Sequence, residues 1–359
     1  MAKLDQEAGK TARLRLLLLD WYAHNRRDLP WRRNPDPYSV WVSEIMLQQT
    51  RVAAVVERHQ AFLARFPTLV SLALASEEDV LAMWSGLGYY RRARMLHKAA
   101  QFLASHHQGN IPVTSEALRT LPGIGVYTAA AISSIAFGEV VAVVDGNVER
   151  VLCRLEGWEA GGRAGGATLK RKIEVLANHL VDPAHPGDFN QALMELGATV
   201  CLPRNPHCMV CPLAADCQTR GEHKTQPRPR MLSREVAHAL SVRGGCQPGE
   251  ADCEVLLERR PASFTVMPGL WELPTLLDSS VPEQDLCMTV RHAIMQVNYY
   301  VRIRTVSERD IKTLAALGGE RRWVPLSVAA TMALTGLARK VLKRARLLPA
   351  AQPVTIAQA

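Results

Sequence analysis

Long apolar runs are absent from this 359-residue sequence. No stretch approaches the roughly 20 apolar residues that a membrane-spanning helix needs, and the run Leu16–Leu19 ends at Asp20. The first residues are charged and lack the apolar segment of a secretion signal. We therefore expect a cytoplasmic protein, associated with the nucleoid if the source is bacterial. In such a compartment the eight cysteines suit metal ligands or buried thiols better than disulfides.

Acidic residues are the scarcer charged type, with 34 Asp and Glu against 43 Lys and Arg, which gives a formal net charge of +9. A basic excess of this size suits a polyanionic partner, either nucleic acid or an acidic membrane surface, although it also serves solubility alone. With 48% hydrophobic and 21% charged residues, the chain has the composition of a globular protein. Its length favours two domains over one.

The first 220 residues or so lack the alternation of β-strands. Segments 41–66 and 80–83 carry apolar residues at helical spacing, and short glycine-containing turns separate such segments. This part is therefore predicted to be all-α. Residues 226–230, with the sequence Gln-Pro-Arg-Pro-Arg, cannot continue a helix and predict an extended linker.

Beyond this linker the apolar residues recur with the period of a strand. Alternate residues from Ala293 to Ile303 are apolar, which predicts one half-buried strand, and a second strand is predicted over 254–258. A basic helix is expected over 333–347. The predicted parts are thus a helical domain over 1–222, a linker over 223–233, an α+β domain over 234–347 and a loose tail over 348–359.

Four cysteines within a short segment form the pattern C-x6-C-x2-C-x5-C: Cys201, Cys208, Cys211 and Cys217. Structural zinc sites usually draw on two C-x2-C pairs, whereas this run has one, so the spacing favours one 4Fe–4S cluster over a zinc ion. The sequence has no glycine-rich nucleotide fingerprint, no flavin-type motif and no second cluster. We therefore expect a cluster that folds a loop rather than one that serves a redox enzyme. The other cysteines, at 153, 246, 253 and 287, are expected to be ordinary core or surface residues.

A glycine turn joins two predicted helices, over 114–121 and 126–137, the first capped at Thr114 or Ser115. Gly123 and Gly125 permit unusual backbone angles and leave N–H groups uncovered at the start of the second helix. Such a hairpin binds a phosphate without reading its base. The alternative is an ordinary corner between two helices.

Two carboxylates stand in contrasting surroundings. Glu44 lies in an unusually apolar helical segment, where burial would raise its pKa and keep it protonated, and Gln48 follows one turn later on the same face. Asp145 precedes a helix. Cleavage of an N-glycosidic bond needs a proton donor for the departing base and an anion beside the sugar, which such a pair provides. The alternatives are a solvated helix position for Glu44 and a simple N-cap for Asp145.

Taken together, these residues resemble the MutY family of adenine DNA glycosylases, within the helix–hairpin–helix DNA glycosylase superfamily. The resemblance is dense over about residues 12–222. The matching motifs stand in the family's order: LPWR (29–32), PYSVWVSEIMLQQT (37–50), GLGYY (86–90), LPGIG (121–125), VDGN (144–147), ALMELGA (192–198) and the cysteine run.

The resemblance implies a monomeric glycosylase of base-excision repair that removes adenine mispaired with 8-oxoguanine or guanine in double-stranded DNA. It implies that Glu44 protonates adenine and later positions water, and that Asp145 is the anion that stabilises the oxocarbenium-like state. The target nucleotide would leave the base stack to reach them. The implied substrate and DNA contacts are Arg32, which would line the base pocket, Gln48, Tyr89, Gly123, Gly125, Tyr127 and Asn147.

Position 127 separates this family from its neighbours. Endonuclease III-like members carry a lysine there, whose amine attacks the sugar and allows strand cleavage. Tyr127 has no amine, which predicts a monofunctional enzyme. Two other functions stay open: a catalytically silent iron–sulfur DNA-binding protein, and an endonuclease III-like glycosylase-lyase.

The second domain carries a weaker resemblance. Arg259 and the segment PGLWELP (268–274) are similar to the Nudix-like domain with which this family recognises 8-oxoguanine. The acidic helix of Nudix hydrolases does not follow Pro274, so hydrolysis of nucleoside triphosphates is not expected. Where the family usually has Phe-Ser-His, this chain has Ile294-Met295-Gln296, which leaves its preference for 8-oxoguanine over guanine open.

Overall fold

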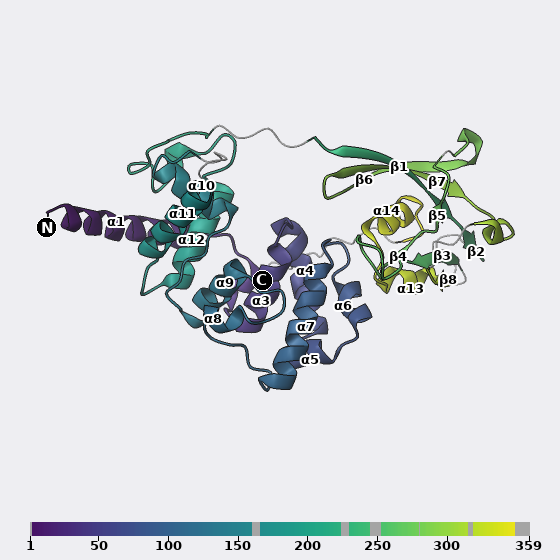
Figure 1. The fold of residues 1–359 in the computed structure, drawn as a ribbon, viewed down its shortest axis with the longest axis horizontal. Helices are drawn as coiled ribbons and strands as arrows, with labels where there is room; N and C mark the ends of the chain where they lie inside the picture. Colours follow the sequence, from purple (N-terminus) through teal and green to yellow (C-terminus); the bar gives the residue numbers. More distant parts are fainter. Residues whose placement is uncertain are drawn as a thin grey trace. The chain divides into compact units, whose positions relative to one another are not determined.

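The computed structural model describes residues 2–159, 166–223, 230–244, 253–279, 281–314 and 319–348 (Figure 1). The chain divides into two compact units, Met1–Ala73 with Lys98–Pro227 and Leu74–His97 with Arg228–Ala359. The division after Pro227 falls in the predicted linker, of which 224–229 lie outside the described residues, as do 349–359 of the predicted tail. No local pattern in the sequence predicts that residues 74–97 belong to the C-terminal unit.

The described part of the chain up to residue 223 is helical, as predicted. None of the helices in the described ranges is long and apolar enough to cross a membrane. The helices are α1 (Ala2–Asn25), α2 (Pro30–Arg33), α3 (Pro37–Leu47), α4 (Val52–Arg65), α5 (Leu69–Leu74), α6 (Glu77–Met83), α7 (Arg91–His106), α8 (Ser115–Leu118), α9 (Val126–Phe137), α10 (Gly146–Leu155), α11 (Gly166–Leu180) and α12 (Pro186–Thr199), with a 3-10 turn at Cys208–Val210.

Capping residues fix where several of these helices begin. Asp36 accepts a hydrogen bond from the Ser39 amide at 2.8 Å, and Pro37 provides the fixed φ of a first helical position. Thr114 caps α8 through the Ala117 amide at 3.3 Å. The predicted cap at Thr114 and the predicted helix over 126–137 are confirmed, whereas α8 ends earlier than residue 121.

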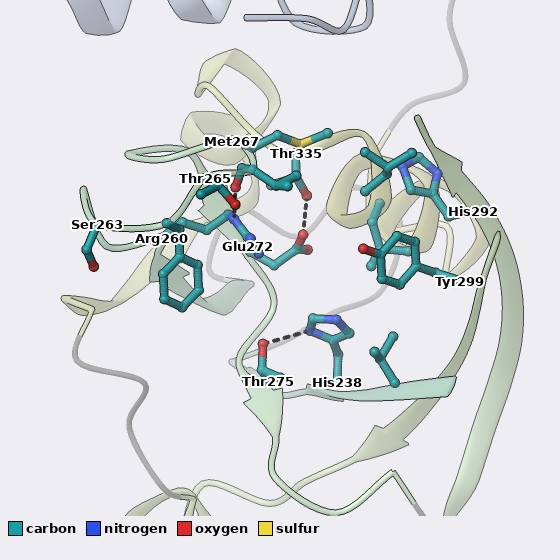
Figure 2. A pocket seen from close by; sticks show the side chains of 15 residues that line it. His238, Arg260, Ser263, Thr265, Met267, Glu272, Thr275, His292, Tyr299 and Thr335 are labelled. Carbon is teal, nitrogen blue, oxygen red and sulfur yellow. Dashed lines mark hydrogen bonds between the residues drawn. The ribbon is translucent and has the colours of Figure 1, made fainter. Parts of the chain in front are cut away.

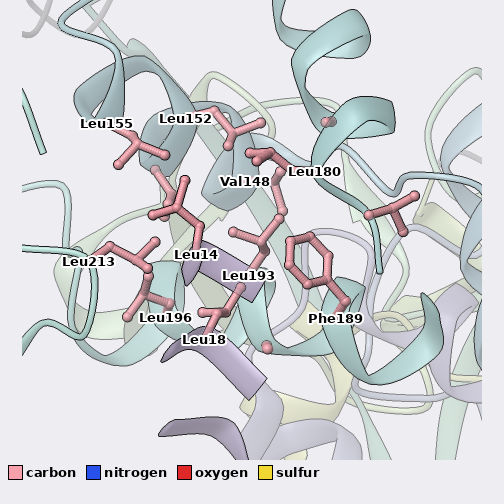
Figure 3. Close-up of a cluster of buried hydrophobic side chains, with 14 of the residues drawn as sticks. Leu14, Leu18, Val148, Leu152, Leu155, Leu180, Phe189, Leu193, Leu196 and Leu213 are labelled. Atoms are coloured by element: carbon pink, nitrogen blue, oxygen red, sulfur yellow. The ribbon is translucent and has the colours of Figure 1, made fainter. Parts of the chain in front are cut away.

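One hydrophobic core cluster of the N-terminal unit lies among α1, α10, α11 and α12 (Figure 3). Its large apolar side chains lie on one face of each helix and are almost fully buried, so the hydrophobic effect fixes how these helices pack. Representative members are Leu18, Val148, Leu152, Phe189, Leu193 and Leu196.

One glycine sets the closest approach in this core. A Cβ atom at Gly197 on α12 would stand 2.6 Å from Cβ of Asn147 on α10, and 3.1 Å from backbone atoms of the same residue. The two helices therefore pack nearly backbone to backbone at the residue that follows Asp145-Gly146. The position of α10, and with it the position of Asp145, depends on this glycine.

We expect Gly197→Ala to destabilise the protein by about 1–3 kcal/mol, because the added methyl group forces α10 and α12 apart. Gly146→Ala is the matched control, since a Cβ atom there meets nothing within 4 Å. Urea unfolding measures both. Equal stability of the two variants would contradict the close packing at Gly197.

The C-terminal unit contains two four-stranded sheets. One has the order β5-β1-β7-β6, with β1 and β7 parallel; in the other, β3 pairs with β2, β4 and β8. The elements are β1 (Leu232–Leu240), β2 (Val242–Arg243), β3 (Glu254–Arg259), β4 (Trp271–Glu272), β5 (Thr275–Leu276), β6 (Leu286–Ile294), β7 (Val297–Thr305), β8 (Arg321–Pro325), α13 (Leu326–Thr331) and α14 (Gly336–Arg344), with 3-10 turns at Glu283–Asp285 and Asp310–Thr313.

Hydrogen bonds join residues 74–97 to this unit. The Tyr90 hydroxyl donates to the Leu334 carbonyl at 3.1 Å, and Nε of Arg339 donates to the Ser85 hydroxyl at 3.0 Å. Tyr90, Ser85 and Leu334 are all buried, so these bonds lie within the unit rather than on its surface.

Three expectations for this unit were wrong in detail. The single strand over 293–303 is instead a hairpin, because β6 ends at Ile294 and β7 begins at Val297, with Met295 at a φ of 53° in the turn. The final helix is shorter than 333–347, since Thr335 caps it through the Ala338 amide. Cys253 is disulfide-bonded rather than an isolated thiol. The strand predicted over 254–258 is confirmed as β3.

Candidate active site

Glu44 is buried in the middle of α3, with 5% of its surface exposed. The neighbouring residues of this helix, from Val40 to Met46, are buried as well. The hydroxyl of Tyr127, in the first turn of α9, donates a hydrogen bond to Oε2 of Glu44 at 2.8 Å. The solvated helix position that the sequence left open for Glu44 is therefore excluded.

Burial raises the pKa of Glu44 to about 7. The hydrogen bond from Tyr127 and the positive charge of Arg32 act in the opposite direction, while the negative charge of Asp145 raises the pKa further. Burial and the charge of Glu44 also hold the Tyr127 pKa well above its usual value, so the phenol remains a donor at neutral pH. Glu44 is thus a carboxyl group that both gives and takes a proton near pH 7.

Asp145 caps the N-terminus of α10. One carboxylate oxygen accepts hydrogen bonds from the amides of Asn147 at 2.9 Å and Val148 at 2.7 Å, and the other accepts one from Nδ2 of Asn147 at 2.9 Å. The N-cap role is therefore real. These three bonds, together with the positive end of the helix dipole, stabilise a negative charge at this point.

A buried ion-pair cluster positions Arg32. Nη2 of Arg32 lies 2.8 Å from Oε2 of Glu195, and Arg27 bonds both oxygens of the same carboxylate at 2.7 Å. Burial alone would raise the Glu195 pKa, but the hydrogen bonds from Arg27 and Arg32 lower it to about 2. Arg32 also lies over the ring of Tyr22, 5.5 Å from its centroid.

Glu195 lies within the motif ALMELGA (192–198), but it is not among the site residues predicted from the sequence. The signal was available, because Glu195, like Glu44, is an acidic residue in an otherwise apolar stretch of helix, ALMELGA.

The turn between α8 and α9 has the backbone of a tight hairpin. Gly123 has a φ of 77°, and Gly125 is the N-cap of α9 without a side chain over the first amides of the helix. A Cβ atom at Gly125 would meet nothing within 4 Å, so the space in front of these amides is open. Nearby, Nε2 of Gln48 donates to the hydroxyl of Thr128 at 3.1 Å, which ties the end of α3 to α9.

Tyr89 lies in a strained turn of the C-terminal unit, between α6 and α7. Its φ is 46°, an unusual value for a tyrosine, and 46% of its surface is exposed. The guanidinium of Arg92 lies 5.6 Å from the Tyr89 ring and 5.5 Å from the Trp84 ring, and donates to the carbonyls of Leu87 and Gly88. These contacts hold an exposed aromatic ring in a defined position.

The four clustered cysteines line one small cavity beside the C-terminal end of α10. Arg154 lines it too: Nη1 lies 3.3 Å from Sγ of Cys201, and Nε is buried without a hydrogen-bond partner. The amide of Arg220 donates to Sγ of Cys217 at 3.5 Å. Within the described residues, no group of three or more His, Cys, Asp or Glu side chains is arranged to hold a single metal ion.

Comparison with known proteins finds similarity over part of this chain. The profile of the HhH-GPD superfamily of base excision DNA repair proteins matches residues 42–176. The human protein named adenine DNA glycosylase is 43% identical over 263 residues, which are 71% of this chain and 47% of that protein. The protein of the same name from Arabidopsis thaliana is 37% identical over 333 residues, 82% of this chain and 51% of that protein. The chain is therefore similar over residues 42–176 to the HhH-GPD superfamily, and the curated relatives that it matches are named adenine DNA glycosylase.

The chain spans about half the length of the curated relatives it matches. Its HhH-GPD region, residues 42–176, contains Glu44, Tyr127 and Asp145 but not the cysteine run. The solved structure of a thermostable thymine-DNA glycosylase is also similar, with a TM-score of 0.53 and 28% sequence identity over 60% of this chain and 98% of that one.

The raised pKa of Glu44 predicts a pH-dependent stability of the HhH-GPD region. Since the folded-state pKa of about 7 lies above the ordinary value of 4.5, the native state favours the protonated carboxyl. Its stabilising contribution is complete below pH 4.5 and is lost as the pH rises through 7. Glu44→Gln keeps a neutral side chain, so its stability relative to wild type should rise by about 2–3 kcal/mol between about pH 5 and about pH 8.

Urea unfolding across this pH range is the measurement. Glu57→Gln, on the exposed face of α4, is the control. A difference between Glu44→Gln and wild type that does not change with pH would contradict a neutral Glu44 in the folded protein.

Proposed function

We propose that this chain is a monofunctional DNA glycosylase of base-excision repair that hydrolyses the N-glycosidic bond of adenine mispaired with 8-oxoguanine or guanine in double-stranded DNA. The observation that carries the proposal is the buried pair of Glu44 and Tyr127 with Asp145 close enough to act on the Glu44 pKa. The similarity to proteins named adenine DNA glycosylase, at 37–50% identity, supports the choice of base.

The proposed reaction uses the two carboxyl groups for different tasks. Protonated Glu44 donates its proton to a ring nitrogen of adenine, which makes the base a neutral leaving group as the bond to C1′ breaks. Asp145, whose carboxylate oxygens accept three hydrogen bonds at the start of α10, stabilises the positive charge that develops on the sugar. The Glu44 carboxylate then accepts a proton from the water that attacks C1′, which restores the acid.

Tyr127 positions this acid. Its hydroxyl occupies one lone pair of Oε2, so the proton that Glu44 transfers is directed to the other oxygen. Because Tyr127 has no amine, no Schiff base with the sugar forms at this position, which distinguishes the proposal from a glycosylase-lyase.

The proposed duplex contacts lie on several elements. The glycine turn at Gly123 and Gly125, which leads into the N-terminus of α9, suits a DNA phosphate, and Gln48, Tyr89 and Asn147 are proposed to contact the opened duplex. Arg32, which is held in position by its ion pair with Glu195, is proposed to line the base pocket.

We further propose that the C-terminal unit is Nudix-like and reads the base opposite adenine. The residues Ile294-Met295-Gln296 form the tip of the β6–β7 hairpin, and Met295 is 73% exposed there. An exposed apolar side chain at a hairpin tip suits contact with a base pair.

For the cysteine cavity we propose one 4Fe–4S cluster on Cys201, Cys208, Cys211 and Cys217. Four thiols from one loop line a common space, and the buried Arg154 provides a positive charge beside the negative charge that thiolate ligands bring. When bound, the cluster would supply iron–thiolate bonds that hold this loop together. Arg150 connects the loop to the candidate active site, because it bonds the Cys201 carbonyl at 2.8 Å and Oδ1 of Asn147 at 2.9 Å.

Single-turnover release of adenine from synthetic duplexes tests the function. We expect release opposite 8-oxoguanine and guanine, and little opposite cytosine. Glu44→Gln should bind the same duplexes and lose release by at least about a hundredfold, since general acid catalysis contributes on the order of 100- to 10,000-fold.

Retained release by Glu44→Gln would remove the acid assignment. Binding without release by wild type would favour a silent DNA-binding protein. Strand cleavage with a borohydride-trapped adduct would favour the glycosylase-lyase.

Cys211→Ser should abolish the broad visible absorbance that an iron–sulfur cluster gives, because one iron loses its thiolate. Cys287→Ser, at an exposed free thiol on β6, should leave the spectrum unchanged. Absorbance and metal analysis of the purified proteins are the measurements. A colourless wild-type protein that contains one zinc ion would contradict the iron–sulfur assignment and favour a zinc site.

A further inference from the structure

The C-terminal unit encloses a cavity of about 460 Å³ that the proposed base-release chemistry does not use (Figure 2). Its walls come from β1, β4, β6, β7, the loop between β3 and β4, and the start of α14. The volume lies within the range of about 300–1,000 Å³ that is usual for small-molecule sites. The cavity is therefore large enough for a ligand such as a mononucleotide.

A buried carboxylate lies in the wall of this cavity. Glu272 is 5% exposed, and its oxygens accept hydrogen bonds from the Thr335 hydroxyl at 2.6 Å and the Leu273 amide at 3.0 Å. Thr335 is itself the N-cap of α14, so the carboxylate lies at the positive end of that helix. Each oxygen accepts one of these bonds and keeps a further lone pair for another donor.

Two other polar side chains face the same space as Glu272 in Figure 2, His238 and Tyr299. Nδ1 of His238 lies 2.9 Å from the Leu273 carbonyl, which only accepts, so Nδ1 carries a hydrogen. His292 also lines the cavity, and burial lowers its pKa, so it is neutral at pH 7. The lining thus places the acceptor-only carboxylate of Glu272 beside imidazole rings and hydroxyl groups, which also donate.

The rest of the lining combines the Arg260 guanidinium and several hydroxyl groups with apolar and aromatic side chains. Val236, Ile294 and Leu337 form aliphatic walls, and Phe264 and Tyr299 each add an aromatic ring to the lining. A ligand that fits is planar, mostly apolar on its faces, and carries N–H donors along one edge.

We infer that this cavity binds a guanine mononucleotide. The N1–H and 2-amino groups of guanine are adjacent donors that match the two oxygens of one carboxylate, here Glu272. Adenine presents one amino group beside a bare ring nitrogen, whose lone pair would face a carboxylate oxygen. Arg260, whose guanidinium is positively charged, is among the lining residues and suits the phosphate. This site is independent of the proposed glycosylase reaction.

Titration calorimetry of the full chain with GMP, IMP and AMP tests the inference. Each of the three nucleotides carries the same phosphate group, so a difference in their affinities reports on the edge of the base. GMP should bind about tenfold more tightly than IMP, which lacks the 2-amino group, and more tightly still than AMP.

Glu272→Gln should weaken GMP binding by at least about tenfold, because an amide replaces one acceptor with a donor. Glu258→Gln is the matched control: Glu258 is 4% exposed in the same unit and pairs with Arg321 at 3.3 Å, but it does not line the cavity. Glu44→Gln should keep wild-type affinity for GMP, which shows that the nucleotide does not bind at the candidate active site.

Equal affinity for GMP and AMP, no binding at millimolar concentration, or unchanged binding by Glu272→Gln would each overturn the inference. Loss of GMP binding in Glu44→Gln would overturn it as well. If Glu272→Gln fails to fold by circular dichroism, the preference of wild type for GMP over IMP and AMP decides, together with a severalfold loss in Tyr299→Phe.

Discussion

The hydrogen bond between Tyr127 and Glu44 is the interaction on which the candidate active site depends. It joins α3 to the first turn of α9 inside an apolar region, where a carboxylate without a partner would be strongly disfavoured. Burial holds the Glu44 pKa near 7 rather than near its ordinary value, and Tyr127 limits how far it rises. Tyr127 thus positions the Glu44 carboxyl group, and because tyrosine has no amine it also excludes an amine nucleophile at position 127.

The second carboxylate depends on backbone packing rather than on burial. Asp145 ends an extended segment and begins α10, and α10 is fixed against α12 where Gly197 meets Asn147. Asn147 in turn donates to Asp145 and accepts from Arg150, which also bonds the carbonyls of Gly197 and Cys201. One arginine therefore links the candidate anion, the helix contact and the cysteine loop.

Much of this could be predicted from the sequence, because its signals are local. The apolar segment around Glu44, the glycine turn before α9 and the capping position of Asp145 are each visible within a few residues. The Tyr127–Glu44 bond and the ion pairs of Glu195 with Arg27 and Arg32 join residues far apart in the chain, and no local pattern reports them. The β6–β7 hairpin was missed for a different reason. Its turn residue Met295 is apolar and stands two residues from both Ala293 and Val297, so the alternation of apolar residues continues through the turn.

The parallel pairing of β1 with β7 has a consequence for how the chain is assembled. Leu232 pairs with Val297 and Leu240 with Thr305, so β1 has no parallel neighbour until the polypeptide has passed through β6 and back along β7. Residues 74–97 belong to the same unit and are synthesised earlier still. Contacts this distant along the chain make folding slow, since a long loop must close before they stabilise it. During synthesis, α6 and the residues around Tyr90 are exposed to solvent and to chaperones long before their partners emerge, which makes this unit the kinetically vulnerable part of the molecule.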